Sequence, residues 1–138
     1  MNLLRLGIKK IILVDYDKVD LHNLNRQIMF SFKDVGESKV KSCIKNAEFH
    51  NIGNTELVGF EGDVLLEWQK IIDFAKESDI IFNMIDYGDW FDLACQSLAL
   101  KLKIPLIQGG TFAVTLSVDY FSPEAKPCAL CLNPMKDN

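Results

Sequence analysis

Two adjoining stretches, LGIKKIILV (residues 6–14) and DYDKVDLHNLNRQ (residues 15–27), determine how the rest of this sequence is interpreted. The first is an apolar run typical of a buried strand. The second brings three aspartates, two asparagines and an arginine to the point where that strand ends. Ligands of open α/β sheets bind at the carboxyl ends of the strands. The stretch therefore indicates a binding site rather than a solvated loop.

The apolar periodicity along the chain predicts alternating strands and helices. Apolar residues spaced every three or four positions favour helices, and short apolar runs between turn residues favour strands. The expected order is strand 11–15, helix 38–50, strand 55–60, helix 63–75, strand 79–85, helix 88–103 and strand 104–107. This order predicts an α/β, Rossmann-like, doubly wound fold with a mainly parallel sheet and right-handed connections.

The segment from Thr111 to Phe121 breaks this pattern. Its apolar and polar residues alternate with period two, which predicts one long strand with a solvated face. Such a strand, close to the C-terminal end, is able to join the sheet antiparallel or to pair with a partner chain.

The composition limits the classes of protein to consider. A chain of 138 residues with 49% hydrophobic residues has the length and apolar content of one domain. The net charge of -4 provides no basic surface for a nucleic acid. No apolar run approaches the roughly 18 residues of a membrane span, and the N-terminus lacks the order of a signal peptide. We therefore expect a cytoplasmic protein that binds neither nucleic acids nor membranes.

Polar residues at the exit of the first strand are candidates for binding a nucleotide. Asp15 is placed to accept hydrogen bonds from ribose hydroxyls, although an aspartate there also caps turns. Asn23 adds further polar groups, and Arg26 is able to make forked hydrogen bonds to phosphate oxygens, unless it is an ordinary surface arginine.

Two charged residues further along the chain fit the same kind of site. Lys39 lies in the first turn of an expected helix, where the dipole disfavours a cation unless an anion lies nearby. Asp86 ends the strand in FNMID and would share the carboxyl edge of the sheet with Asp15. Cations for the phosphates and one acid for a metal are what a magnesium triphosphate site needs. The alternative is that Asp86 caps the following helix, a role also open to Asp89.

The pair Cys128 and Cys131, in PCALC, supplies half of the ligands of a tetrahedral structural zinc site. A redox role is less favoured, because the pair follows a strand with period-two alternation rather than opening a helix. Cys95 lies on the apolar face of an expected helix and is interpreted as a core residue.

These motifs together resemble the ThiF-type, ubiquitin-activating (E1-like) adenylating family. The matching stretches occur in the family's order and at similar intervals over nearly the whole chain: LVDYDKVDLHNLNRQ, GESKV, FNMID, IPLIQGGT and PCALC. The resemblance implies that Asp15 binds the ribose of ATP, Asn23 and Arg26 the phosphates, Lys39 the phosphate region, and Asp86 the magnesium ion. It also implies that Cys128 and Cys131 form the first half of a zinc site.

The chain departs from the family's pattern in three respects. The glycine-rich phosphate loop, which the family carries on a first strand before the position of Asn2, has no match. A second cysteine pair and the C-terminal region that carries a thioester nucleophile in some members are also missing. Tyr87 follows Asp86 where many relatives have asparagine. Residues 1–138 are therefore expected to form a partial ThiF-type adenylation domain, truncated at both ends.

The resemblance implies ATP-dependent adenylation of the C-terminal carboxylate of a ubiquitin-like or sulfur-carrier protein, by a homodimer or heterodimer. One alternative is a noncatalytic partner subunit that keeps the fold to dock a protein, but it does not explain Arg26, Lys39 and Asp86. An NAD-linked dehydrogenase with Asp15 on a ribose is a weaker alternative, since it leaves Arg26, Lys39 and the cysteine pair unexplained.

Overall fold

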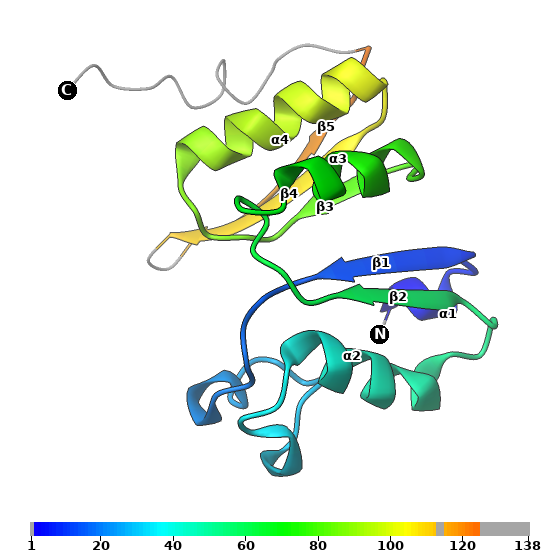
Figure 1. Cartoon of the computed structure of the whole chain (residues 1–138), viewed down its shortest axis with the longest axis vertical. Helices are drawn as coiled ribbons and strands as arrows, with labels where there is room; N and C mark the ends of the chain where they lie inside the picture. The colour runs from blue at the N-terminus through cyan, green and yellow to red at the C-terminus, as the bar shows by residue number, and fades with distance from the viewer. Residues whose placement is uncertain (1, 113–114, 125–138) are drawn as a thin grey trace. The chain divides into compact units, whose positions relative to one another are not determined.

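The computed structural model describes residues 2–112 and 115–124 of the chain. The chain divides into two compact units, Met1–Trp68 and Gln69–Asn138, and each unit is described by itself (Figure 1). Within each unit a helix separates one pair of strands that run parallel: β1 and β2 across α2 in the first unit, and β3 and β4 across α4 in the second. The predicted α/β class is confirmed.

The first unit is built on a parallel strand pair. Strands β1 (Lys10–Val14) and β2 (Glu56–Phe60) pair in register from Lys10 with Glu56 to Val14 with Phe60. The elements around them are helix α1 (Asn2–Arg5), helix α2 (Lys39–Ala47) and three short 3-10 helices, η1 (Leu21–Asn23), η2 (Phe32–Asp34) and η3 (Glu48–His50). Helix α2 connects the two strands and packs against β2.

Helix α2 begins and packs as its sequence predicts. The Ser38 hydroxyl oxygen accepts a hydrogen bond from the backbone N–H of Lys41 at 3.3 Å, which caps the first turn. Val40 and Ala47, which lie seven residues apart and so on one face of the helix, are buried.

The second unit is a three-stranded mixed sheet with helices. Its elements are helix α3 (Trp68–Lys76), strand β3 (Ile81–Asn83), helix α4 (Asp89–Leu102), and strands β4 (Leu106–Phe112) and β5 (Thr115–Phe121). The strand order is β3-β4-β5, with β3 parallel and β5 antiparallel to β4. Helix α4 packs on β3 and β4 (Figure 1), and Phe91, Leu98, Leu106 and Phe121 are buried in the core of this unit.

The predicted single strand from Thr111 to Phe121 is wrong. Thr111 and Phe112 belong to β4, whereas the chain from Thr115 onward forms β5, which pairs back along β4 from Phe112 with Thr115 to Leu106 with Phe121. A period-two alternation runs on unchanged through a chain reversal, so it does not reveal one. Of the two arrangements left open, the antiparallel addition to the sheet is the one observed.

The end of the expected strand 79–85 and the start of the expected helix 63–75 are both displaced, and in each case a side chain hydrogen-bonds to the backbone nearby. Strand β3 ends at Asn83, because the Asn83 Oδ1 accepts a hydrogen bond from the Ile85 N–H at 3.2 Å and the chain turns there. Helix α3 begins at Trp68, five residues after the expected cap. Asp63 caps the preceding turn instead, accepting hydrogen bonds from the N–H groups of Leu65 at 2.8 Å and Leu66 at 3.4 Å.

None of the helices in the described part of the chain is long and apolar enough to cross a membrane.

Candidate functional site

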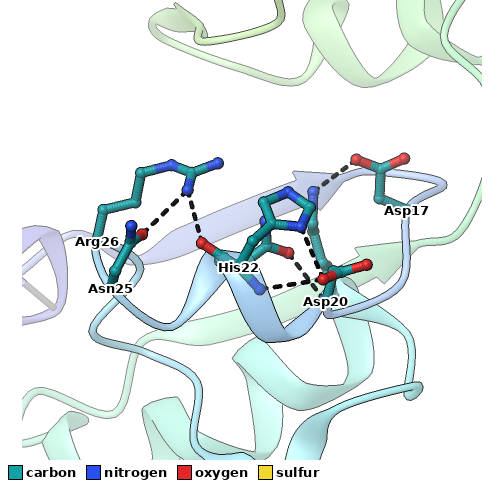
Figure 2. Close-up of polar contacts among 7 residues, drawn as sticks. Asp17, Asp20, His22, Asn25 and Arg26 are labelled. Atoms are coloured by element: carbon teal, nitrogen blue, oxygen red, sulfur yellow. Dashed lines mark hydrogen bonds and ion pairs between the residues drawn. The ribbon is translucent and has the colours of Figure 1, made fainter.

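The loop between β1 and α2 carries most of the predicted site residues, and its first turn is held by a pair of reciprocal caps. The Asp20 carboxylate accepts from the His22 N–H at 3.0 Å, and the Asn23 Oδ1 accepts from the Asp20 N–H at 2.9 Å. The His22 ring Nδ1 lies 2.7 Å from the same carboxylate (Figure 2). The hydrogen bonds from the His22 backbone N–H and, after it, from the His22 ring hold the pKa of Asp20 below its ordinary value.

Asn23 is buried, and its side-chain Oδ1 accepts the hydrogen bond of this cap. The structure therefore gives Asn23 a role in shaping the loop. Its predicted role in binding phosphate stays a prediction.

Arg26 lies on the exposed surface of the same loop. Its Nη1 donates to the His22 carbonyl at 2.8 Å and to the Asn25 Oδ1 at 3.1 Å, which orients the guanidinium (Figure 2). Within residues 2–112 and 115–124, no hydrogen bond is made by Nη2 or Nε. Arg26 is thus held by one nitrogen, and its other two nitrogens, with three N–H donors, make no hydrogen bond to the described residues.

Lys39, at the start of α2, lies beside two carboxylates at the exit of β1. Its ammonium is 2.5 Å from the Asp17 Oδ2 and 3.9 Å from the Asp15 Oδ2. The Asp15 Oδ1 in turn accepts from the Asp17 N–H at 2.8 Å. The sequence predicts an anion near Lys39, and in the structure the carboxylate of Asp17 lies beside its ammonium.

The far end of the loop is anchored by a buried carboxylate. Asp34 accepts hydrogen bonds from the Ser31 N–H at 2.8 Å, the Ser31 hydroxyl at 2.7 Å and the Asn46 amide at 3.1 Å. The Asn46 amide also donates to the Met29 carbonyl at 2.7 Å, so this cluster fixes residues 29–34 against α2. The hydrogen bond from the Ser31 hydroxyl is the main reason that the pKa of Asp34 is lowered.

Asp86 belongs to the second unit, on the loop between β3 and α4. This loop is shaped by the buried Asn83, whose amide donates to the Asp92 Oδ1 at 2.8 Å while its Oδ1 accepts from Ile85. Burial raises the pKa of Asp92, with smaller contributions from the nearby Asp86 and Asp89. The Asp86 carboxylate is exposed and makes no hydrogen bond or ion pair with the residues that the structure describes.

The structure thus brings together part of the predicted site. Asp15 and Lys39 lie close to each other, with Asn23 and Arg26 in the loop between them in sequence. Asp86 lies in the other unit, so its shared edge with Asp15 stays a prediction. Among the described residues, no three His, Cys, Asp or Glu side chains are grouped to hold a metal ion. Cys128 and Cys131 lie outside the described residues.

Sequence reasoning did not identify Asp17 and Asn83. Asp17 contacts Lys39 across a separation of 22 residues, and Asn83 links the Asp86 loop to the first turn of α4. The Asp-x-Asp spacing of residues 15 and 17 was the one available signal for Asp17. No local pattern distinguishes Asn83 from other polar residues at a strand end.

Comparisons with known proteins place this geometry in a family. The ThiF family model matches residues 1–138. A ubiquitin-activating enzyme E1-like protein of Saccharomyces cerevisiae is 32% identical over 123 residues, which cover 86% of this chain and 18% of that protein. An adenylyltransferase and sulfurtransferase MOCS3 of Caenorhabditis briggsae is 31% identical over 130 residues, covering 93% of this chain and 31% of the relative.

A solved structure has the same fold as this chain. The crystal structure of E. coli MccB with MccA-N7isoASN superposes with a TM-score of 0.83 at 21% identity and covers 99% of this chain and 39% of that chain. The chain spans less than two fifths of the length of each of these three proteins. The match of the family model over the full chain is the decisive finding: this chain belongs to the ThiF family.

Proposed function

We propose that this chain carries the nucleotide-binding part of an enzyme that uses ATP to adenylate the C-terminal carboxylate of a ubiquitin-like or sulfur-carrier protein. The observation that carries the proposal is the cluster at the exit of β1, where the Lys39 ammonium lies 3.9 Å from Asp15 at the end of a parallel strand. Ligands of this class of sheet bind at that end of the strands. The names of the relatives, an adenylyltransferase among them, support the same reaction.

In the proposed reaction, a carboxylate oxygen of the carrier protein forms a bond to the α-phosphorus of ATP. The bond from this phosphorus to the bridging oxygen breaks, and pyrophosphate leaves. Negative charge shifts to the leaving phosphates, and Arg26 and Lys39 are the cations of this chain that would balance it. The hydroxyls of the ribose would donate to Asp15, and Asn23 would hold the loop that carries Arg26.

Asp86 has the donor chemistry that magnesium prefers. It offers an exposed carboxylate that is without a partner among the described residues. Magnesium in nucleotide sites keeps several waters and takes one or two carboxylates together with phosphate oxygens, so a cluster of three acids is not required. A bound Mg²⁺ would supply positive charge to the phosphates. The zinc assignment of Cys128 and Cys131 stays a part of this proposal that rests on the resemblance.

Pyrophosphate exchange into ATP tests the proposal, because adenylation is reversible and needs no later thioester step. The assay uses the chain extended at its N-terminus by a strand and glycine-rich loop, with candidate carrier proteins. Asp86→Asn keeps the size of the side chain and removes its charge, so exchange should fall by orders of magnitude. Asp89→Asn is the matched control, since Asp89 is also exposed and lies three residues away in the first turn of α4.

Arg26→Ala is expected to raise the activation free energy of exchange by on the order of 2 kcal/mol. The rate of exchange should then fall about 30-fold. Lys33→Ala, at an exposed position in η2, is its control and should change little. If Asp86→Asn exchanges as fast as Asp89→Asn, the metal assignment is wrong. If the extended chain exchanges with no carrier at all, the noncatalytic partner subunit becomes the better interpretation.

A further inference from the structure

The exit of β1 and the entry of α2 are joined by a short antiparallel ladder of backbone hydrogen bonds. The Val19 N–H donates to the Glu37 carbonyl at 2.8 Å, and the Gly36 N–H donates to the Val19 carbonyl at 2.8 Å. The Lys39 N–H donates to the Asp17 carbonyl at 3.0 Å. This ladder places the first residue of α2 directly beside Asp17.

The side chains add a second connection at the same point. The Asp17 carboxylate contacts the Lys39 ammonium at 2.5 Å, and the Asp17 N–H donates to the Asp15 carboxylate. The Lys39 side chain is 15% exposed, whereas those of Lys41 and Lys45 on the same helix are 71% and 73% exposed. Lys39 is therefore the most enclosed of the three, although the Lys41 ammonium also pairs with the Glu61 carboxylate at 2.9 Å on the surface.

We propose that Asp17 is a positioning residue that holds the Lys39 ammonium at the exit of β1, beside Asp15, before the nucleotide binds. This inference rests on the proposed function, in which Lys39 meets the phosphates. A lysine side chain has a flexible four-carbon stem, so fixing its ammonium beside a ligand costs conformational entropy. A carboxylate that already restrains the ammonium reduces the entropy lost when the ligand binds. Asp17 itself contacts no reacting atom in this scheme.

The backbone carbonyl and the side-chain carboxylate of Asp17 make separate contacts with Lys39. The backbone carbonyl of residue 17 belongs to the ladder and remains in any variant at this position. Asp17→Asn therefore removes the charge that holds Lys39 while it leaves the backbone connection in place. Asp17→Glu keeps the charge on a longer side chain and serves as the conservative variant.

The first test measures the reactivity of single lysines in the 138-residue chain without nucleotide. Acetylation by an N-hydroxysuccinimide ester is followed at each lysine by mass spectrometry. Asp17→Asn should raise the labelling rate of Lys39 several-fold and leave Lys41 and Lys45 unchanged, and Asp17→Glu should keep the rate near that of the wild type. The matched control is Asp73→Asn, which removes the exposed partner of Lys76, 2.9 Å away, and should affect Lys76 alone.

An unchanged rate at Lys39 in Asp17→Asn would overturn the proposal. An equal increase at Lys39, Lys41 and Lys45 would overturn it as well, because the carboxylate would then maintain the fold of the loop rather than the position of one ammonium.

The second test measures pyrophosphate exchange by the N-terminally extended chain. Asp17→Asn should lower kcat by about one order of magnitude or more, since a misplaced group slows the chemical step, with the KM for the carrier protein unchanged. Asp17→Glu should recover part of the loss, and Asp73→Asn should match the wild type. If labelling rises in Asp17→Asn but exchange stays at the wild-type level, the positioning role is refuted and the adenylation proposal stands. If the wild type shows no exchange, the adenylation proposal fails, while the labelling result still decides whether Asp17 holds Lys39.

Discussion

At the scale of single residues, the loop after β1 depends on Asp34. Only 2% of this residue is exposed, and its carboxylate is the acceptor for the Ser31 N–H, the Ser31 hydroxyl and the Asn46 amide. Asp34→Ala would leave these buried donors without partners, so we expect a loss of on the order of 3 kcal/mol in the free energy of unfolding. Urea denaturation followed by circular dichroism measures it.

Lys45→Ala is the control for this prediction, because the Lys45 ammonium is 4.0 Å from Asp34 and its side chain is 73% exposed. Its effect should be about 0.5 kcal/mol or less, as for exposed ion pairs. Equal losses in the two variants would contradict the assignment of the hydrogen bonds as the source of stability.

The lowered pKa of Asp34 also predicts the effect of acid. The ionised carboxylate stabilises the fold fully above the ordinary aspartate pKa of 3.8, and this contribution is lost as the pH falls through the lower pKa of the folded state. The wild type should therefore lose stability on acidification below that value more steeply than Asp34→Asn. Parallel pH profiles of the two proteins in urea would refute the prediction.

At the scale of elements, the contact between α2 and β2 requires a glycine in the strand. A Cβ atom at Gly59 would lie 2.5 Å from the Val40 Cγ1 and 2.6 Å from the Ile44 Cδ1, so both side chains of α2 would have to move. Gly59→Ala should lower the free energy of unfolding by about 1–3 kcal/mol, as overpacking does in a filled core.

Gly110→Ala is the matched substitution in a strand of the other unit. Among the described residues, its Cβ would come within 4 Å of the Ser117 hydroxyl oxygen alone, at 3.7 Å, which is an ordinary contact distance. We expect a change within about 0.5 kcal/mol of zero. If Gly59→Ala proves as mild as Gly110→Ala in urea denaturation, α2 and β2 do not pack as described.

At the scale of the whole molecule, we expect a homodimer or heterodimer. The resemblance to the ThiF family suggested this, and the second unit offers a supporting observation. Leu106 and Phe121, which are partners in the β4–β5 register, are buried, whereas Leu116, Val118 and Tyr120, which alternate along β5 on the face opposite to Phe121, are 63–73% exposed. Exposed apolar faces of this kind are typical of interaction surfaces.

Light scattering of the extended chain at high concentration measures the association. Val118→Lys should weaken it, whereas Gln69→Lys, at an exposed polar position on α3, should not. A monomer at every concentration, with and without a carrier protein, would count against the dimer.

The sequence alone determined the α/β class, the order of the elements and the family, because each of these follows from local pattern. Apolar periodicity marks the core faces of α2 and α4, Ser38 marks the start of a helix, and the run from Asp15 to Gln27 is specific enough to carry the resemblance. The identities of Asp15, Asn23, Arg26, Lys39 and Asp86 as candidates came from the same local reading.

Only the tertiary structure decided how these residues are paired. The contact of Lys39 with Asp17, the burial of Asn23 within a cap, the hairpin between β4 and β5, and the link from Asn83 to Asp92 all join groups whose partners are chosen by chain packing. Local spacing constrains neighbours within one turn or one strand, whereas a hydrogen bond between distant residues depends on where the backbone folds back. That is why the chemistry of the residues was predictable and their partners were not.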